Sequence, residues 1–185
     1  MRKLVYALVL AAALALSAAH EATAGNVAYR AYKVARAQLG DKYQYGAEGP
    51  DRFDCSGLTW YSYKLAGRPI RRTTQAQYLY SQHIPAAARH LGDLVFFLRS
   101  GLPRHVGIYA GRGYMIHANS GSYYGRKVIR ERITGYWLTY YSVRYARITR
   151  AAPARFTSAL DRGDVASLRA ARSGALRSGQ WGACS

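Results

Sequence analysis

The hydrophobic pattern of this chain changes its period part-way along. Between residues 26 and 80 apolar residues recur at helical spacing, whereas beyond Gly92 they form short continuous or alternating runs typical of strands. Helices followed by strands favour an α+β domain in which the strands form an antiparallel sheet. We therefore predict N-terminal helices packed on an antiparallel β-sheet.

Three helices are predicted in the first half. The first begins at Asn26 and ends at Gly40, with one apolar face formed by Val27, Ala31, Val34, Ala35 and Leu39. Residues 41–54 contain Gly46, Gly49 and Pro50 and are predicted to be a loop. The second helix is expected at residues 55–65. The third is capped by Thr73 or Thr74 and should direct inward Ala76, Leu79 and Tyr80.

The strands are predicted from five later stretches. They are LVFFL (94–98), HVGIY (105–109), YMIHA (114–118) and two further segments near residues 128–130 and 141–147. A glycine-bearing turn separates the second and third stretches, which predicts a hairpin.

The two ends of the chain differ from this domain, which we place at residues 25–150. Arg2 and Lys3 precede an uncharged apolar run (residues 4–16), and residues 22–24 offer an A-x-A cleavage site. The run is too short to span a bilayer comfortably, so a cleaved signal peptide (1–24) is favoured over an uncleaved anchor. We expect an exported protein, periplasmic or secreted and associated with the cell wall. Residues 151–185 form a tail predicted to be weakly helical or disordered.

The formal net charge is +18. Such an excess can indicate nucleic acid, but export argues against it, so we expect no nucleic-acid partner. Anionic cell-wall polymers or phospholipid head groups are the expected partners of the basic surface. A basic surface that only keeps the protein soluble is the alternative.

Only two cysteines are present, Cys55 and Cys184, and they do not make a disulfide framework. Cys55 stands at the predicted start of the second helix, where the helix dipole lowers the pKa of a thiol. A neighbouring imidazolium would lower it further. Cys55 is therefore a candidate nucleophile, with a small buried filler as the alternative. Cys184 lies in the tail and is interpreted as incidental.

Four histidines follow residue 25. His83 and His90 lie in polar surroundings and are predicted to be surface residues. His105 alternates with Val106 and Ile108, so it faces away from them. His117 follows 12 positions later on the next strand, and a loop of odd length places both imidazoles on one face. One could act as a base and the other could orient it.

Other interpretations of these residues remain open. Histidines on strands are often surface or packing residues. Cys55, His105 and His117 could also bind zinc, although no close ligand pair such as C-x-x-C accompanies them. Two other functional classes are a catalytically silent wall-binding module and a basic nucleic-acid binder that uses its tyrosines for stacking.

Four stretches in order carry a resemblance to a known family. They are YQYG (43–46), FDCSGLTWY (53–61), GDLVFF (92–97), and HVGIY followed by MIHAN (115–119). With their spacing, they make residues 28–147 resemble the NlpC family of bacterial cell-wall cysteine peptidases, which are papain-like in fold. The resemblance implies a nucleophilic cysteine at a helix N-terminus and no metal or other cofactor.

The resemblance also implies roles for individual residues. Cys55 matches the nucleophile, His105 the general base and His117 the residue that orients the base. Tyr43 matches a tyrosine that helps the oxyanion hole beside the Cys55 backbone N–H, a first-turn donor without an acceptor in the helix. Two neighbours match residues that line the substrate cleft, namely Asp54 and Ser56. Helix capping is the alternative for Asp54.

The implied function is hydrolysis of peptidoglycan stem peptides by a monomeric enzyme. The expected bond is the one between D-γ-glutamate and the diamino acid. A D-Ala to diaminopimelate cross-link is the alternative, and an acyltransferase or amidase is a more distant one. The family often has Gly-Gly where this chain has Gly46-Ala47, which bears on substrate preference.

Overall fold

The computed structural model describes residue 6 and residues 26–149, so the predicted signal peptide and tail lie outside the described residues. A helix occupies residues 26–37. The elements that follow are β1 (Lys42–Tyr43), β2 (Arg52–Phe53), α2 (Cys55–Leu65), α3 (Thr74–Tyr80), β3 (Gln82–Ile84), η1 (Ala86–Ala88), β4 (Leu94–Arg99), β5 (Leu102–Tyr109), β6 (Tyr114–Ala118), η2 (Ser122–Tyr124), β7 (Val128–Arg132), α4 (Tyr136–Tyr140) and β8 (Ser142–Arg147). In this part of the chain no helix is both long and apolar enough to cross a membrane.

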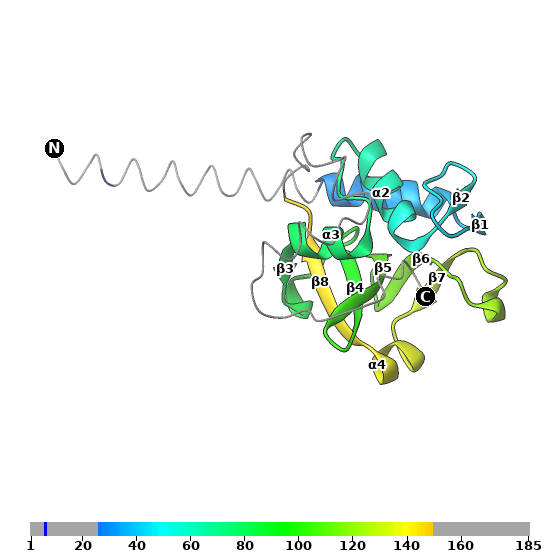
Figure 1. Cartoon of the computed structure of the whole chain (residues 1–185). Coiled ribbons are helices and arrows are strands. Elements are labelled where there is room, and N and C mark those ends of the chain that lie inside the picture. Colours follow the sequence, from blue (N-terminus) through cyan, green and yellow to red (C-terminus); the bar gives the residue numbers. More distant parts are fainter. Residues whose placement is uncertain (1–5, 7–25, 150–185) are drawn as a thin grey trace, which may run out of the picture.

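Six strands form one antiparallel sheet in the order β3-β8-β4-β5-β6-β7. The first helix, α2 and α3 lie together on one side of it, and α4 lies away from them (Figure 1). The prediction of N-terminal helices on an antiparallel sheet is confirmed. The loop predicted at 41–54 contains β1 and β2, which pair in parallel.

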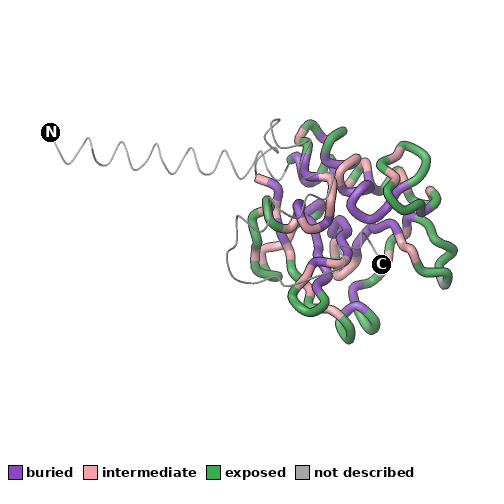
Figure 2. Tube along the Cα trace, in the orientation of Figure 1, coloured by how far each residue is buried: buried purple, intermediate pink, exposed green. Residues whose placement is uncertain are grey.

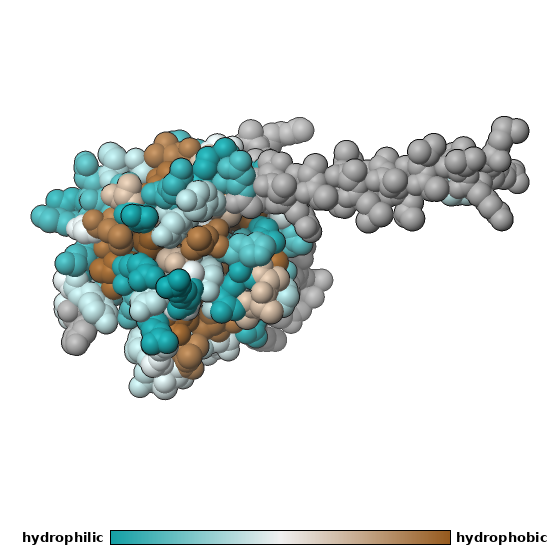
Figure 3. Space-filling view, turned by 180° about the vertical axis from the view of Figure 1, so that it is seen from behind, coloured by the Kyte–Doolittle hydropathy of each residue, from teal (hydrophilic) through white to brown (hydrophobic). Residues whose placement is uncertain are grey.

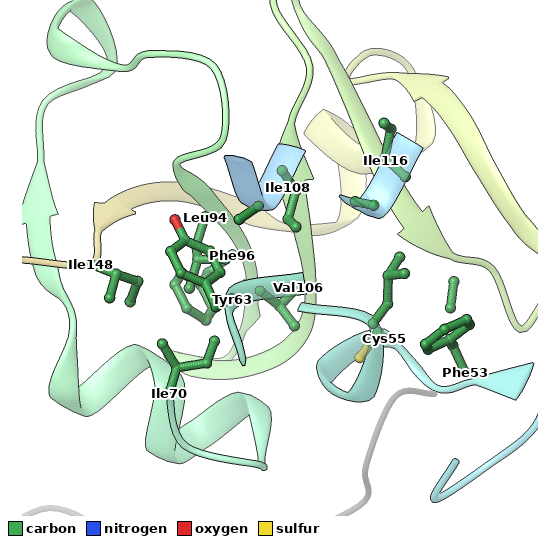
Figure 4. Close-up of a cluster of buried hydrophobic side chains, with 14 of the residues drawn as sticks. Phe53, Cys55, Tyr63, Ile70, Leu94, Phe96, Val106, Ile108, Ile116 and Ile148 are labelled. Carbon is green, nitrogen blue, oxygen red and sulfur yellow. The ribbon is translucent and has the colours of Figure 1, made fainter. Parts of the chain in front are cut away.

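The sheet has an apolar layer on each face because its strands alternate buried side chains between the two. Under the helices a large cluster includes Leu94, Phe96, Val106, Ile108 and Ile116 (Figure 4). On the other face a smaller cluster gathers around Trp137 of α4, with members Val95, Phe97, Tyr109, Met115 and Ile133. The central strands are therefore buried from both sides, as Figure 2 shows.

Three side chains predicted to point inward do not. Leu39 is exposed because the first helix ends at residue 37, one turn before the expected stop. Leu79 and Tyr80 are exposed because α3 buries Thr74, Ala76 and Gln77 instead. The amide of Gln77 bonds the carbonyl oxygens of Ser56 and Arg71, so a polar contact decides which face of α3 packs.

Candidate active site

Cys55 is the first residue of α2, as predicted, and its side chain is buried. Asp54 caps this helix, since its backbone is extended and its Oδ1 accepts a hydrogen bond of 2.6 Å from the Gly57 N–H. The capped first turn points its backbone N–H groups toward the start of the helix, where they favour negative charge. Local sequence thus places the sulfur at the positive end of α2.

Arg72 organises the residues on both sides of Cys55. Its guanidinium donates to both carboxylate oxygens of Asp54 at 2.7 and 3.1 Å and to the Ser56 hydroxyl at 2.9 Å. It also bonds Glu48 at 2.8 Å. Burial acts to lower the pKa of Arg72, but the bonds to Asp54 and Glu48 outweigh it and raise that pKa. Asp54 and Ser56 are each 1% exposed, so both lie beneath the surface.

Gly57 lets the loop before α2 approach the helix closely. The Ala47 carbonyl accepts from the Asp54 N–H at 3.0 Å and lies where a side chain on residue 57 would be, 2.0 Å from a Cβ built there. The Gly in the FDCSG stretch is therefore required by backbone contact. Ala47 therefore holds this loop against α2 through its carbonyl oxygen and not through its side chain.

The sulfur of Cys55 lies between α2 and α3. Its Sγ is 3.5 Å from the Thr74 hydroxyl, and Figure 4 shows it at the helix start beside Phe53. Cys184 lies outside the described residues.

The two strand histidines meet, as the sequence predicted. Their Nε2 (His105) and Nδ1 (His117) atoms are 2.8 Å apart, and both side chains are buried. The pairing of Ala110 with Tyr114 leaves a three-residue loop, residues 111–113, all with positive φ. This odd loop length puts both imidazoles on one face. Val106 and Ile116, their strand neighbours, point into the cluster under the helices.

Glu131 extends the histidine pair and was not predicted. Its Oε2 is 2.9 Å from His117 Nε2. A carboxylate only accepts hydrogen bonds, so His117 carries its proton on Nε2 and presents a lone pair at Nδ1 to His105. The sequence held one signal, since Glu131 is the only acidic residue between Asp93 and Asp161.

Trp137 covers this polar chain and was also missed. Its ring stacks on His105 at a centroid distance of 5.0 Å and meets His117 edge-on at 5.4 Å. Phe97 packs against both Trp137 and His105. Aromatic rings on this face exclude water from the imidazoles, which strengthens electrostatic interactions among the groups they cover.

Burial sets the protonation of the three groups. It lowers the pKa of His105 well below its usual range, and charge on His117 lowers it further. Burial also lowers the pKa of His117, which Glu131 opposes. For Glu131, burial would raise the pKa, but the bond to His117 and the nearby Trp137 indole outweigh it and lower that pKa. The indole N–H makes no hydrogen bond of standard geometry, so we assign it a weak electrostatic contact.

The N-terminal end of α3 connects the cysteine with the histidines. Thr74 contacts Cys55, and the neighbouring Gln75 donates from its side-chain amide to the Pro103 carbonyl at 3.3 Å. Pro103 precedes His105 by two residues on β5, and α2 itself packs against β5. Cys55 and His105 therefore belong to elements that contact each other directly.

Comparison with known proteins places this geometry in a family. The family model described as NlpC/P60 matches residues 40–147, more than half of the chain. The chain belongs to the NlpC/P60 family. The prediction made from the four sequence stretches is confirmed.

Individual relatives support this family assignment. A Corynebacterium glutamicum protein named "Probable endopeptidase" is 39% identical over 112 residues, which cover 60% of this chain and 53% of that protein. Two solved structures share its fold. NlpC1 from Trichomonas vaginalis is 34% identical with a TM-score of 0.59, and the match covers 66% of this chain and 44% of that chain. The peptidoglycan hydrolase RipB from Mycobacterium tuberculosis is 26% identical with a TM-score of 0.57, and the match covers 71% of this chain and 68% of that chain. The chain spans about half the length of the Corynebacterium relative.

The remaining predicted site residues of this NlpC/P60 domain are placed as follows. Tyr43 lies on β1 opposite Phe53, so its backbone is beside the segment that leads into Cys55. Burial and the nearby Asp54 raise the pKa of its hydroxyl, which keeps it a proton donor near neutral pH. His83 and His90 are exposed, as expected. Among the described residues no cluster of three His, Cys, Asp or Glu side chains has the arrangement of a metal site.

A pocket of about 410 Å³ opens beside His105. Its wall combines the histidine and Glu131 with polar loop residues and aromatic rings, the latter from Tyr124, Tyr136, Trp137 and Tyr141. Cys55 is not on this wall, so the pocket extends from His105 and not from Cys55.

Proposed function

We propose that this chain is an exported cysteine endopeptidase that hydrolyses peptidoglycan stem peptides. The observation that carries the proposal is the hydrogen-bonded chain of His105, His117 and Glu131. Its first member, His105, lies on β5, the strand against which the helix that begins at Cys55 packs. Relatives named as an endopeptidase and a peptidoglycan hydrolase support the substrate class.

Acylation begins with the reduced Cys55 thiolate, paired with a protonated His105. The sulfur attacks the scissile carbonyl carbon, and the developing oxyanion is held by the Cys55 N–H and the Tyr43 hydroxyl. The carbon–nitrogen bond breaks as His105 donates its proton to the leaving amine. The acyl part of the peptide remains on Cys55 as a thioester.

Deacylation returns the enzyme to its starting state. Neutral His105 accepts a proton from water, which attacks the thioester carbonyl. The carbon–sulfur bond breaks, which regenerates the Cys55 thiolate beside protonated His105. The product leaves as a carboxylic acid, which gives its proton to solvent. His117 keeps the His105 ring in one orientation throughout both steps.

The pocket beside His105 is assigned to the leaving side of the substrate. His105 protonates the leaving amine, so the residue that carries this amine lies next to the histidine. In a stem peptide cleaved after D-γ-glutamate, that residue is the diamino acid. Cleavage of a D-Ala to diaminopimelate cross-link would put a diamino acid in the same pocket, so both bonds remain candidates.

Export and wall attachment complete the proposal. The first 24 residues supply the signal peptide, and the net charge of +18 attracts anionic wall polymers or phospholipid head groups. Exposed basic residues on β7 and just before it include Arg126, Lys127, Arg130 and Arg132. On the face shown in Figure 3, hydrophilic and apolar residues are interleaved.

Digestion of purified sacculi by the reduced protein tests the function. We expect soluble fragments whose masses identify the cleaved bond, and no fragments from Cys55→Ala. The assay contains a thiol reductant, because only the reduced thiolate is nucleophilic.

Two controls accompany this experiment. Cys184→Ser should digest sacculi like the wild type when both are reduced, since we assign it no chemistry. Turnover by Cys55→Ala at the wild-type rate would contradict the mechanism, and intact sacculi after treatment with the reduced wild type would contradict the proposed substrate.

A further inference from the structure

The hydrogen bond between His105 and His117 can run in either direction, and Glu131 can fix which histidine donates. A neutral imidazole carries one proton on either of two nitrogens, and a base must present the nitrogen without it to the thiol. His105 and His117 contact each other at 2.8 Å, so one of them donates and the other accepts. Two buried neutral histidines alone could be arranged either way.

Glu131 removes this ambiguity. Its carboxylate accepts a hydrogen bond from His117 Nε2, 2.9 Å away, which leaves His117 Nδ1 as an acceptor. His105 must then donate from Nε2 to His117, and its own Nδ1 becomes the nitrogen that accepts a proton. The direction of every bond in the chain follows from the one group that cannot donate.

The same carboxylate stabilises charge. When His105 takes the thiol proton, a positive charge forms in a site where His105 is 4% and His117 0% exposed. Burial and mutual repulsion limit the pair to one such charge, and Glu131 is the described carboxylate that contacts it. Burial and the neighbouring Tyr136 raise the pKa of Tyr141, a phenol on the pocket wall, to about 12, so this phenol stays neutral and does not replace Glu131.

We propose that Glu131 is a positioning residue that fixes the tautomers of His117 and His105 and so sets His105 Nδ1 as the base. The inference deepens the proposed function, on which it rests. Glu131 lies on the wall of the pocket beside His105, but it does not contact the reacting atoms, and it acts on them through His117.

Glu131→Gln tests the inference, because it keeps the shape of the side chain and removes the charge. Asp51→Asn is the matched control, an exposed carboxylate outside the histidine chain. The first readout is the pH dependence of iodoacetamide alkylation of the reduced protein, which needs no substrate. In Glu131→Gln the alkylation midpoint should move to higher pH, because the imidazolium that stabilises the thiolate has lost its counter-charge.

The second readout is turnover of a soluble muropeptide. We expect kcat of Glu131→Gln to fall roughly tenfold or more. The fall should not exceed the about 10²- to 10⁴-fold that acid–base catalysis supplies. The third is imidazole ¹⁵N NMR, which should show one tautomer for each histidine in the wild type and a mixture in the variant. Glu131→Asp should recover part of the activity.

The outcomes separate the inference from the proposed function. An unshifted alkylation midpoint and an unchanged tautomer in folded Glu131→Gln would overturn the role of Glu131, even if sacculi are digested. A shifted midpoint would support it even if peptidoglycan proves to be the wrong substrate. Equal shifts in Asp51→Asn would attribute the effect to net charge and also overturn the inference.

Discussion

The two halves of the candidate site are built in different ways. Around Cys55 the residues that matter are contiguous, since Asp54 caps the helix that begins at Cys55 and Gly57 accommodates the adjoining loop. The histidine half gathers His105, His117 and Glu131 from three strands. The first half therefore depends on local backbone geometry, and the second on the register of a sheet.

This difference bears on tolerance to change. A capped helix end keeps its dipole and its N–H groups even when a distant side chain moves. A chain of hydrogen bonds loses its direction when any one member is displaced. Substitutions in the histidine half should therefore affect catalysis more than folding, and substitutions around Arg72 should do the reverse.

The largest effect that distinguishes the halves is expected from His105→Ala. Loss of the base should lower kcat by about 10²- to 10⁴-fold. Alkylation of reduced Cys55 should shift toward the ordinary thiol range near pH 8.5, because the imidazolium partner is gone while the helix dipole remains. Stopped-flow alkylation across pH measures this shift.

His83→Ala serves as the control, because His83 is exposed and lies on β3, at the edge of the sheet. Identical alkylation profiles for wild type and His105→Ala would remove His105 from the role of base.

The difference between local backbone geometry and sheet register also explains which parts of the site could be predicted from the sequence. The cysteine at a helix start and the two histidines on one face could be predicted, because capping, period and loop parity are local properties of the chain. Glu131, Trp137 and Arg72 could not. Each depends on which strand or loop lies next to another, and that is decided by packing over long sequence separations. The inward side of α3 was missed for the same reason, since the buried Gln77 is selected by carbonyl groups of other elements.

An intermediate effect, on stability and not on chemistry, is expected from Arg72→Met. The substitution leaves the Asp54 carboxylate buried without its bidentate partner, which should cost about 3 kcal/mol of the free energy of unfolding. Urea denaturation measures the loss. Arg52→Met, at an exposed arginine on β2, should change it little.

A second substitution sharpens the test. Adding Asp54→Asn to Arg72→Met removes the unpaired charge and should recover part of the lost stability. If the single and the double variants are equally unstable, the ion pair does not determine the stability of this half.

The smallest effect concerns the dependence of stability on pH. The pKa of His105 is lowered by burial in the folded protein, whereas an unfolded histidine titrates near 6.5. Below about pH 6.5 the unfolded chain therefore binds a proton that the folded protein does not, and stability falls as the pH falls. One pH unit below that point, the loss from His105 approaches about 1.4 kcal/mol. Thermal unfolding between about pH 7.5 and about pH 5 measures this dependence. Stability should fall less steeply with pH in His105→Gln than in the wild type, and His83→Gln is the control that should match the wild type. Equal slopes for wild type and His105→Gln would mean that the histidine half takes up protons while folded, and its imidazoles would then be less isolated from water than Trp137 and Phe97 suggest.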